Sequence, residues 1–177
     1  MKKYALIVAA MSLVLLFTQQ DDAHAFNRLG GQQKSPRVVY KLGEVKSEYM
    51  SSLSSAMGNW SWGTNNNIKF SQTTNDAIYS AFFQGNYFGD TGWNGLCNNI
   101  PHNGAIYTNS VVSMNYTYGD KYDESKKMAI WTHEMGHALG LAHVTDPWQI
   151  MCTDADGRMA SVPGYDDLNG VRSIYGF

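Results

Sequence analysis

The stretch HEMGHALGLAH, residues 133–143, contains three of the five histidines of the chain. His133 and His137 are four residues apart, so on an α-helix both imidazoles project from the same face, one turn apart. If the helix continued, His143 would point about 240° around the axis from His137. Gly140 lies between them, and glycine tolerates the left-handed conformation at which helices end. We therefore expect the helix to end near Gly140 and the chain to bring His143 back to the same metal ion.

This arrangement predicts a catalytic zinc site rather than a structural one. Three protein ligands leave the fourth position of Zn²⁺ open for water. Glu134, beside the first ligand, can take a proton from that water and later give it to a leaving amine. The alternative is a buried helix that happens to carry histidines, but the spacing H-E-x-x-H-x-x-G-x-x-H is very rare by chance and has a known mechanism. The chemistry suits hydrolysis of a peptide bond.

The start of the chain has the anatomy of a secretory signal peptide. Lysines near the start are followed by thirteen apolar residues at 5–17 and by an A-x-A cleavage pattern at 23–25. A membrane anchor is the alternative, but a spanning helix needs about 20 apolar residues. We therefore expect residues 1–25 to be removed on secretion. Residues 26–177 would then form one extracellular catalytic domain, large enough for a hydrophobic core.

The composition excludes some partners and leaves one covalent link open. The formal net charge is −2 and only 16% of residues are charged, without a basic stripe for nucleic acid. We expect no membrane attachment after signal cleavage, and a monomer. Cys97 and Cys152 are the only cysteines. In an exported protein they most simply form one disulfide, although the sequence does not show whether their Cα atoms lie close enough.

Hydrophobic periodicity predicts strands that come first and helices that are kept apart from them. The expected strands are residues 37–42, 67–72, 77–83, 105–108 and 111–116. The expected helices are residues 44–60, a helix capped by Asp123 or Ser125 that runs into the histidine motif, and a closing helix in DDLNGVRSIYGF, while residues 85–104 are expected to form a long loop. This order indicates the α+β class, with a mixed sheet backed by two helices.

The motif resembles the signature of the metzincin zinc peptidases, which continues to a turn containing a methionine. Met151 follows His143 by eight residues in PWQIM, and Pro147 lies between them. This spacing and the closing sequence GYDDLNGVRSIYGF are similar to the matrixin, or matrix metalloproteinase, branch. Weaker similarity reaches back through NGAIYTN, so the resemblance covers residues 36–177. Met151 by itself could be ordinary core packing, but the resemblance implies that it forms the floor beneath the metal.

The resemblance also implies a fold and a way of binding substrate. The fold is a small, mixed five-stranded twisted sheet backed by two long helices, with the active-site helix, the Met-turn and a C-terminal helix. Gly104 to Asn109 would be the edge strand, whose free N–H and C=O groups pair with an extended peptide. Residues 152–164 would form the wall of the main specificity pocket. The substrate-binding residues are then expected to be Gly104, Ala105, Ile106 and Tyr107, although a merely terminal strand is the alternative.

Several features depart from the matrixin pattern. Matrixins commonly hold a second, structural zinc, but outside the motif the expected mature chain has only His102, so we expect one catalytic zinc ion. Thr153 stands where astacins and serralysins have a tyrosine ligand, which argues against those branches. Asp90, Asp120 and Asp123 could bind calcium, or could be turn and capping residues.

Three functions are compatible with these features. The leading one is a secreted zinc endopeptidase of the matrixin type, with a protein or peptide as substrate. A second is a zinc-containing binding protein or toxin component without proteolysis, although a mere metal site would not need Glu134. A third is a zinc hydrolase that acts on cell-wall peptides, although the sequence shows no separate wall-binding module.

Overall fold

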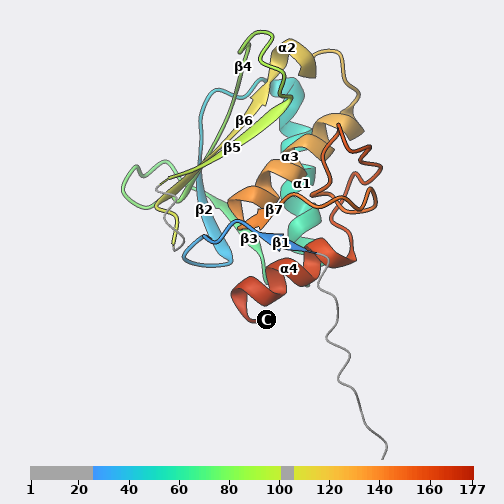
Figure 1. The fold of residues 1–177 in the computed structure, drawn as a ribbon. Helices are drawn as coiled ribbons and strands as arrows, with labels where there is room; N and C mark the ends of the chain where they lie inside the picture. The colour runs from blue at the N-terminus through green and yellow to red at the C-terminus, as the bar shows by residue number, and fades with distance from the viewer. Residues whose placement is uncertain (1–25, 101–105) are drawn as a thin grey trace, which may run out of the picture.

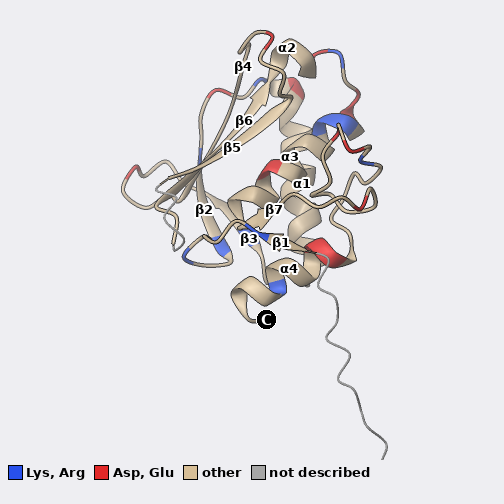
Figure 2. Cartoon of the chain, in the orientation of Figure 1, with Lys and Arg blue, Asp and Glu red and all other residues tan. Residues whose placement is uncertain are grey.

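A computed structural model describes residues 26–100 and 106–177 of the chain. The expected signal peptide, residues 1–25, lies outside the described residues, as do His102, Gly104 and Ala105. In the part that is described, no helix is both long and apolar enough to cross a membrane. Acidic and basic residues are scattered over the ribbon rather than gathered by sign (Figure 2).

The sheet has five strands in the spatial order β3-β2-β4-β6-β5 (Figure 1). In chain order the strands are β2 (Arg37–Leu42), β3 (Lys69–Gln72), β4 (Ala81–Asn86), β5 (Gly95–Ile100) and β6 (Asn109–Asn115). Strands β3, β2, β4 and β6 run parallel to one another, and β5 pairs antiparallel with β6. The predicted mixed five-stranded sheet is confirmed, and β3 and β5 are its two edges.

Two long helices lie side by side against this sheet (Figure 1). They are α1 (Met50–Gly63) and α3 (Glu124–Ala138), while α2 (Tyr116–Gly119) is a single turn and α4 (Tyr165–Tyr175) closes the chain. Trp60 of α1 and Trp131 of α3 are fully buried, and the Trp60 indole N–H donates to the Thr132 carbonyl over 2.9 Å. Burial of one large apolar side chain stabilises the folded protein by about 1.5–3 kcal/mol. This core fixes α3 relative to the sheet.

A second, two-stranded sheet joins the start of the described chain to the end of the histidine motif. Strand β1 (Asn27–Arg28) pairs antiparallel with β7 (Leu141–Ala142), and the Leu29 N–H donates to the Gly140 carbonyl over 2.9 Å. The strand β7 therefore ends directly before His143, and its path is held from outside by the N-terminal segment.

The sequence placed most elements correctly but missed the strand β5 and the two short strands β1 and β7. Residues 37–42 form the predicted strand. The helix predicted at 44–60 begins later, with a 3-10 turn at Ser47–Tyr49 that leads into α1, and it ends at Gly63. Residues 44–46 bond to the sheet and α2 instead: the Glu44 carbonyl accepts from the Gly85 N–H, and the Lys46 N–H donates to the Tyr116 hydroxyl. The loop predicted at 85–104 was wrong in part, because it contains β5. Its sequence GLCNNI has Gly and Asn, which are rare in strands, and pairing with β6 outweighs that preference.

The edge strand predicted at 104–109 is not formed over residues 106–108, and Asn109 already belongs to β6, while Gly104 and Ala105 lie outside the described residues. Ile106 makes only an isolated bridge to Gln32, and Tyr107 is buried, with its N–H donating to the Gln32 carbonyl over 2.8 Å. The N-terminal segment at Gln32 therefore occupies the Tyr107 N–H, one of the backbone groups that were expected to bind substrate. The edge of the sheet near the histidines is β5.

A polar cluster lies at the N-terminal end of α1, and it should affect the stability of the protein in acid. The Asp120 carboxylate accepts from the Tyr49 and Tyr87 hydroxyls over 2.6 Å each and pairs with Lys46 over 3.1 Å. The two hydroxyl bonds lower the pKa of Asp120 to about 2. Because this pKa lies below the ordinary value of 3.8, the stabilisation is present above pH 4 and is lost as the pH falls toward 2.

We therefore expect Asp120→Asn to lower the free energy of unfolding at pH 7 by about 1 kcal/mol, since the partly exposed site limits the loss. The difference from the wild type should shrink as the pH is lowered from 4 to 2. Urea unfolding across this range measures it, and a difference that stayed constant would contradict the assignment.

Candidate metal centre

Helix α3 begins and ends as the sequence predicted. Asp123 is its N-cap, because the Asp123 carboxylate accepts from the Lys126 N–H over 2.8 Å. The helix ends at Ala138, and Gly140 has a φ of 105°, in the region that favours glycine. A side chain at Gly140 would also place its Cβ 2.6 Å from the Gly31 carbonyl oxygen. The break at Gly140 is therefore fixed both by conformation and by contact.

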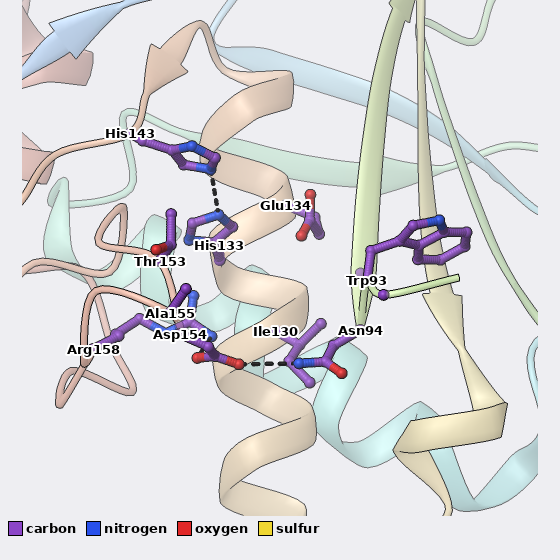
Figure 3. A pocket seen from close by; sticks show the side chains of 12 residues that line it. Trp93, Asn94, Ile130, His133, Glu134, His143, Thr153, Asp154, Ala155 and Arg158 are labelled. Carbon is purple, nitrogen blue, oxygen red and sulfur yellow. Dashed lines mark hydrogen bonds and ion pairs between the residues drawn. The ribbon is translucent and has the colours of Figure 1, made fainter. Parts of the chain in front are cut away.

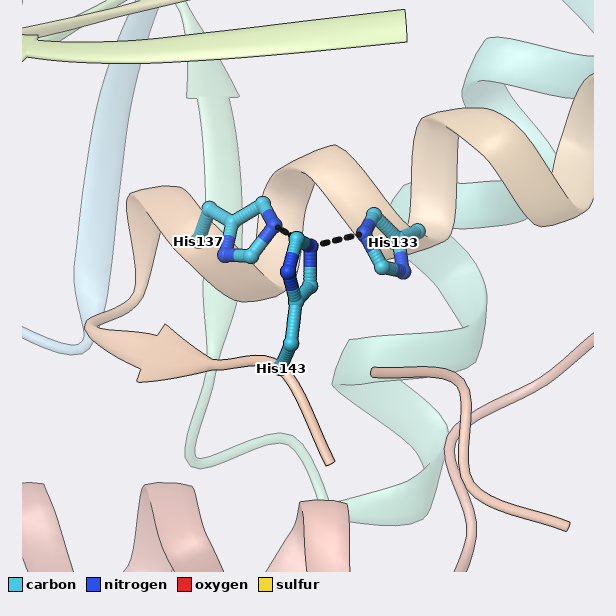
Figure 4. A group of neighbouring side chains, drawn as sticks. All are labelled: His133, His137 and His143. Carbon is cyan, nitrogen blue, oxygen red and sulfur yellow. Dashed lines mark hydrogen bonds between the residues drawn. The ribbon is translucent and has the colours of Figure 1, made fainter. Parts of the chain in front are cut away.

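The break brings the three histidines together, as expected (Figure 4). The Nε2 atom of His143 lies 3.2 Å from that of His133 and 3.0 Å from that of His137. Two nitrogens bound to a tetrahedral Zn²⁺ at about 2.0–2.1 Å are about 3.3 Å apart. The spacing of the three nitrogens therefore fits a zinc ion. Within residues 26–100 and 106–177 this is the only cluster of three His, Cys, Asp or Glu side chains suited to a metal.

Hydrogen bonds at Nδ1 determine the tautomer of His133 and His137. The Nδ1 of His133 lies 2.7 Å from the Ile150 carbonyl oxygen, and that of His137 lies 2.8 Å from the Leu141 carbonyl oxygen. A carbonyl only accepts, so each Nδ1 carries the proton and each Nε2 keeps its lone pair for a metal. Burial lowers the pKa of all three imidazoles, that of His137 to about 4. The triad is therefore neutral at pH 7, the form that binds metal.

Glu134 points from α3 toward the sheet, beside the pocket (Figure 3). Its side chain is buried, and burial raises its pKa to about 8, although the Arg158 guanidinium and the Cys97 N–H oppose the shift. Gly95, the first residue of β5, makes room for it, because a Cβ there would lie 2.8 Å from the Glu134 Oε1. The carboxylate is therefore held between the helix and the edge strand.

The pocket beside His133 and Glu134 has a volume of about 290 Å³. One wall consists of Thr153, Asp154, Ala155 and Arg158, from the segment expected to form the pocket wall, and the opposite side includes Trp93 and Asn94 (Figure 3). Asp154 joins the two sides: its carboxylate accepts from the Asn94 amide over 3.1 Å and pairs with Arg158 and Lys126 over 2.7 Å each. The hydrogen bond and ion pairs of Asp154 therefore link the two polar walls of the pocket.

Met151 lies directly against helix α3, which carries His133 and His137. A Cβ at Gly136 would be 2.2 Å from the Met151 sulfur, so this position, between the first two ligands, must be a glycine for the turn to approach. The turn is held from behind by Asp167, whose buried carboxylate accepts from the N–H groups of Ile150 (2.6 Å), Met151 (3.3 Å) and Gly164 (2.8 Å). Asp167 thereby fixes the Ile150 carbonyl that orients His133.

We expect Asp167→Ala to lower the free energy of unfolding by about 2–4 kcal/mol, because it leaves buried N–H groups without an acceptor. The neighbouring Asp166→Ala is the matched control, since the Asp166 carboxylate does not serve the turn in the described structure. Urea unfolding of both variants measures the difference. Equal losses in the two would contradict the role of Asp167.

The predicted disulfide is not formed in this structure. Cys97 and Cys152 are both free thiols. Cys97 lies on β5, where its Sγ contacts the Asn99 side chain, whereas the Cys152 Sγ faces the Thr153 carbonyl in the chain after the Met-turn. The expectation of a bridge was therefore wrong for this structure.

The three aspartates considered for calcium have other partners. Asp90 accepts from the Tyr118 hydroxyl, Asp120 lies in the tyrosine–lysine cluster, and Asp123 caps α3. Calcium binding therefore stays a prediction of the resemblance alone.

Several residues of the site escaped the sequence reasoning. The carbonyls that orient the ligands belong to Ile150 and Leu141, and a main-chain carbonyl leaves no trace in the residue type. Gly95 lies within residues 85–104, for which the sequence predicts a long loop. Arg158 and Asp154 fell inside the expected pocket wall, and their four-residue spacing was the signal that could have revealed their ion pair.

Comparisons with known proteins show the family of this chain. The profile of the matrixin family matches residues 37–176. A putative matrix metalloproteinase of Trichoplusia ni ascovirus 2c is 43% identical over 56 residues, which are 31% of this chain and 11% of that protein. Human matrix metalloproteinase-25 is 36% identical over 66 residues, 34% of this chain and 12% of that protein. These matches thus span only about a tenth of either relative.

The fold is similar to a solved structure as well. The structure of myroilysin superposes with a TM-score of 0.58, at 13% sequence identity, and covers 82% of this chain and 96% of that one. At this identity the likeness concerns the fold, while the family match extends over most of the sequence. With its histidine triad and Met-turn in place, the chain belongs to the matrixin family of zinc metallopeptidases.

Proposed function

We propose that this chain is a secreted zinc endopeptidase that hydrolyses peptide bonds, with Glu134 as its general base and acid. The observation that carries the proposal is the convergence of three Nε2 atoms beside a buried carboxylate at an open pocket. A binding protein needs the nitrogens but has no use for the carboxylate. The chemistry of this donor set favours zinc over calcium, which prefers oxygen ligands.

His133, His137 and His143 would hold the metal. When bound, zinc lowers the pKa of water and polarises a carbonyl oxygen. Glu134 takes the proton from the attacking water, because its carboxylate lies at the pocket and is not needed as a ligand. The same carboxyl group then gives the proton to the nitrogen of the leaving amine. Burial raises the pKa of Glu134, which makes its carboxylate a stronger base toward the proton of water.

Strand β5 replaces residues 104–109 as the proposed substrate-binding edge. Three of its residues, Gly95, Leu96 and Cys97, line a hollow of about 370 Å³ together with Glu134 and all three histidines. An extended peptide that added to this edge would bring its backbone past the metal. Pairing through the main chain accepts many sequences, so selectivity would come from the polar-walled pocket.

Export is the remaining part of the proposal and rests on the signal-like residues 1–25. The sequence of the purified protein's N-terminus, after secretion by a bacterial host, tests it. A start at Phe26 is expected, and a retained Met1 would contradict export by this route.

A mixed library of quenched peptides, containing both protein and cell-wall sequences, tests the activity. We expect cleavage of protein sequences, its loss with a zinc chelator and its return with added zinc. Cleavage of wall peptides alone would replace the substrate class. A folded, zinc-loaded protein that cleaved nothing would refute the proposed endopeptidase.

A further inference from the structure

We propose that Asn99 is a positioning residue for the metal, acting through the main chain of His137. This role rests on the proposed zinc site. Asn99 lies on β5, almost fully buried, and its side-chain N–H donates to the His137 carbonyl over 3.0 Å. The edge strand therefore bonds directly to the backbone of a metal ligand.

The carbonyl that Asn99 contacts lies where the helix ends. The last four carbonyls of a helix lack partners within the helix, so they must be satisfied from outside. The His137 carbonyl accepts from the Gly140 N–H over 3.0 Å and from Asn99. A carbonyl oxygen has two lone pairs, and both are used here. The last turn of α3 is thus attached to the sheet at the residue that carries the second ligand.

A chain of buried side chains sets the orientation of the Asn99 amide. Because the His137 carbonyl only accepts, the Asn99 nitrogen must face it, and the Asn99 oxygen then faces the Ser110 hydroxyl. Ser110 gives its single proton to that oxygen and accepts from the Gln33 amide over 2.7 Å. Ser110 and Gln33 are fully buried. The donors therefore all point one way, from the N-terminal segment to the ligand.

His137 is consequently held at two points, its ring by the Leu141 carbonyl and its main chain by Asn99. Groups that orient a ligand without touching the metal commonly change metal affinity by about 10–100-fold when removed. An Asn99 side chain that only filled space would affect folding but not the affinity for zinc. This difference separates positioning from packing.

The test uses Asn99→Leu, which keeps the size but removes the donor, and Ser110→Ala, which frees the amide to turn. Ser113→Ala is the matched control, because Ser113 is also buried on β6 and accepts from Gln84, without a bond to a ligand in the described structure. Zinc dissociation constants are measured by competition with a coloured chelator. The visible spectrum of the Co²⁺-substituted protein reports the ligand geometry.

We expect zinc binding to weaken about tenfold in Asn99→Leu and less in Ser110→Ala, with altered Co²⁺ bands, while Ser113→Ala stays within about twofold of the wild type. Wild-type affinity in Asn99→Leu, or an equal loss in Ser113→Ala, would overturn the positioning role. If Asn99→Leu does not fold, Ser110→Ala decides by the same comparison. A wild-type protein that bound no zinc would instead overturn the proposed function, and this role with it.

Discussion

Glu134→Gln is expected to lower kcat for peptide hydrolysis by about 10²–10⁴-fold, the usual contribution of a general acid–base group. Glutamine has nearly the same shape, so it can remain between α3 and Gly95. It cannot take a proton from water or return one to the leaving amine. Since the three imidazoles would hold the metal without Glu134, the variant should still bind zinc at one ion per chain.

The measurement is the hydrolysis rate of the best library peptide, beside the zinc content of the same sample. Glu124→Gln is the matched control, because Glu124 is an exposed carboxylate at the start of the same helix. It should leave the rate unchanged. A Glu134→Gln variant that kept both its zinc and most of its rate would show that the proton is moved by another group.

The metal triad could be predicted because local rules determine it. The four-residue spacing of His133 and His137 follows from the helical repeat, and the return of His143 follows from the glycine at 140. The C-terminal helix and the capping role of Asp123 were likewise visible in short stretches. In each case a residue type carries a conformational preference that neighbouring elements do not override.

The edge strand could not be predicted for the opposite reason. Residues 95–100 have a weak preference for strand, and they form β5 because β6 offers a partner along its whole length. That pairing joins segments that the sequence alone gives no reason to match. The same holds for the carbonyl of Ile150, which orients His133 only because Asp167, from the following helix, holds the turn.

The edge strand β5 is in direct contact with Glu134. In β5 the first residue, Gly95, touches Glu134, and the third, Cys97, gives it an N–H. The proposed substrate edge and the proposed general base are therefore in contact. A substitution in β5 should for this reason change the rate of peptide hydrolysis.

Gly95→Ala tests this coupling. The new Cβ would lie 2.8 Å from the Glu134 Oε1 and 2.6 Å from Ile130 Cγ2, closer than such atoms approach in proteins, so a neighbour must move. The carboxylate, at the end of a flexible side chain, is the group that can give way. Misplacing a reacting group by about 1 Å can cost about 100-fold in rate, and we expect a loss of that order with zinc still bound.

Kinetic constants show which neighbour moves. If the methyl group displaces Glu134, kcat falls and KM changes little, because the binding edge keeps its place. If β5 shifts instead, KM rises, since the backbone groups that pair with substrate have moved. Gly58→Ala is the matched control: its Cβ would meet nothing within 4 Å, and alanine should stabilise α1 by about 0.5–1 kcal/mol without changing either constant. Wild-type kcat and KM in Gly95→Ala would mean that Glu134 is not confined by the strand, and the proposed contact between substrate edge and base would have to be abandoned.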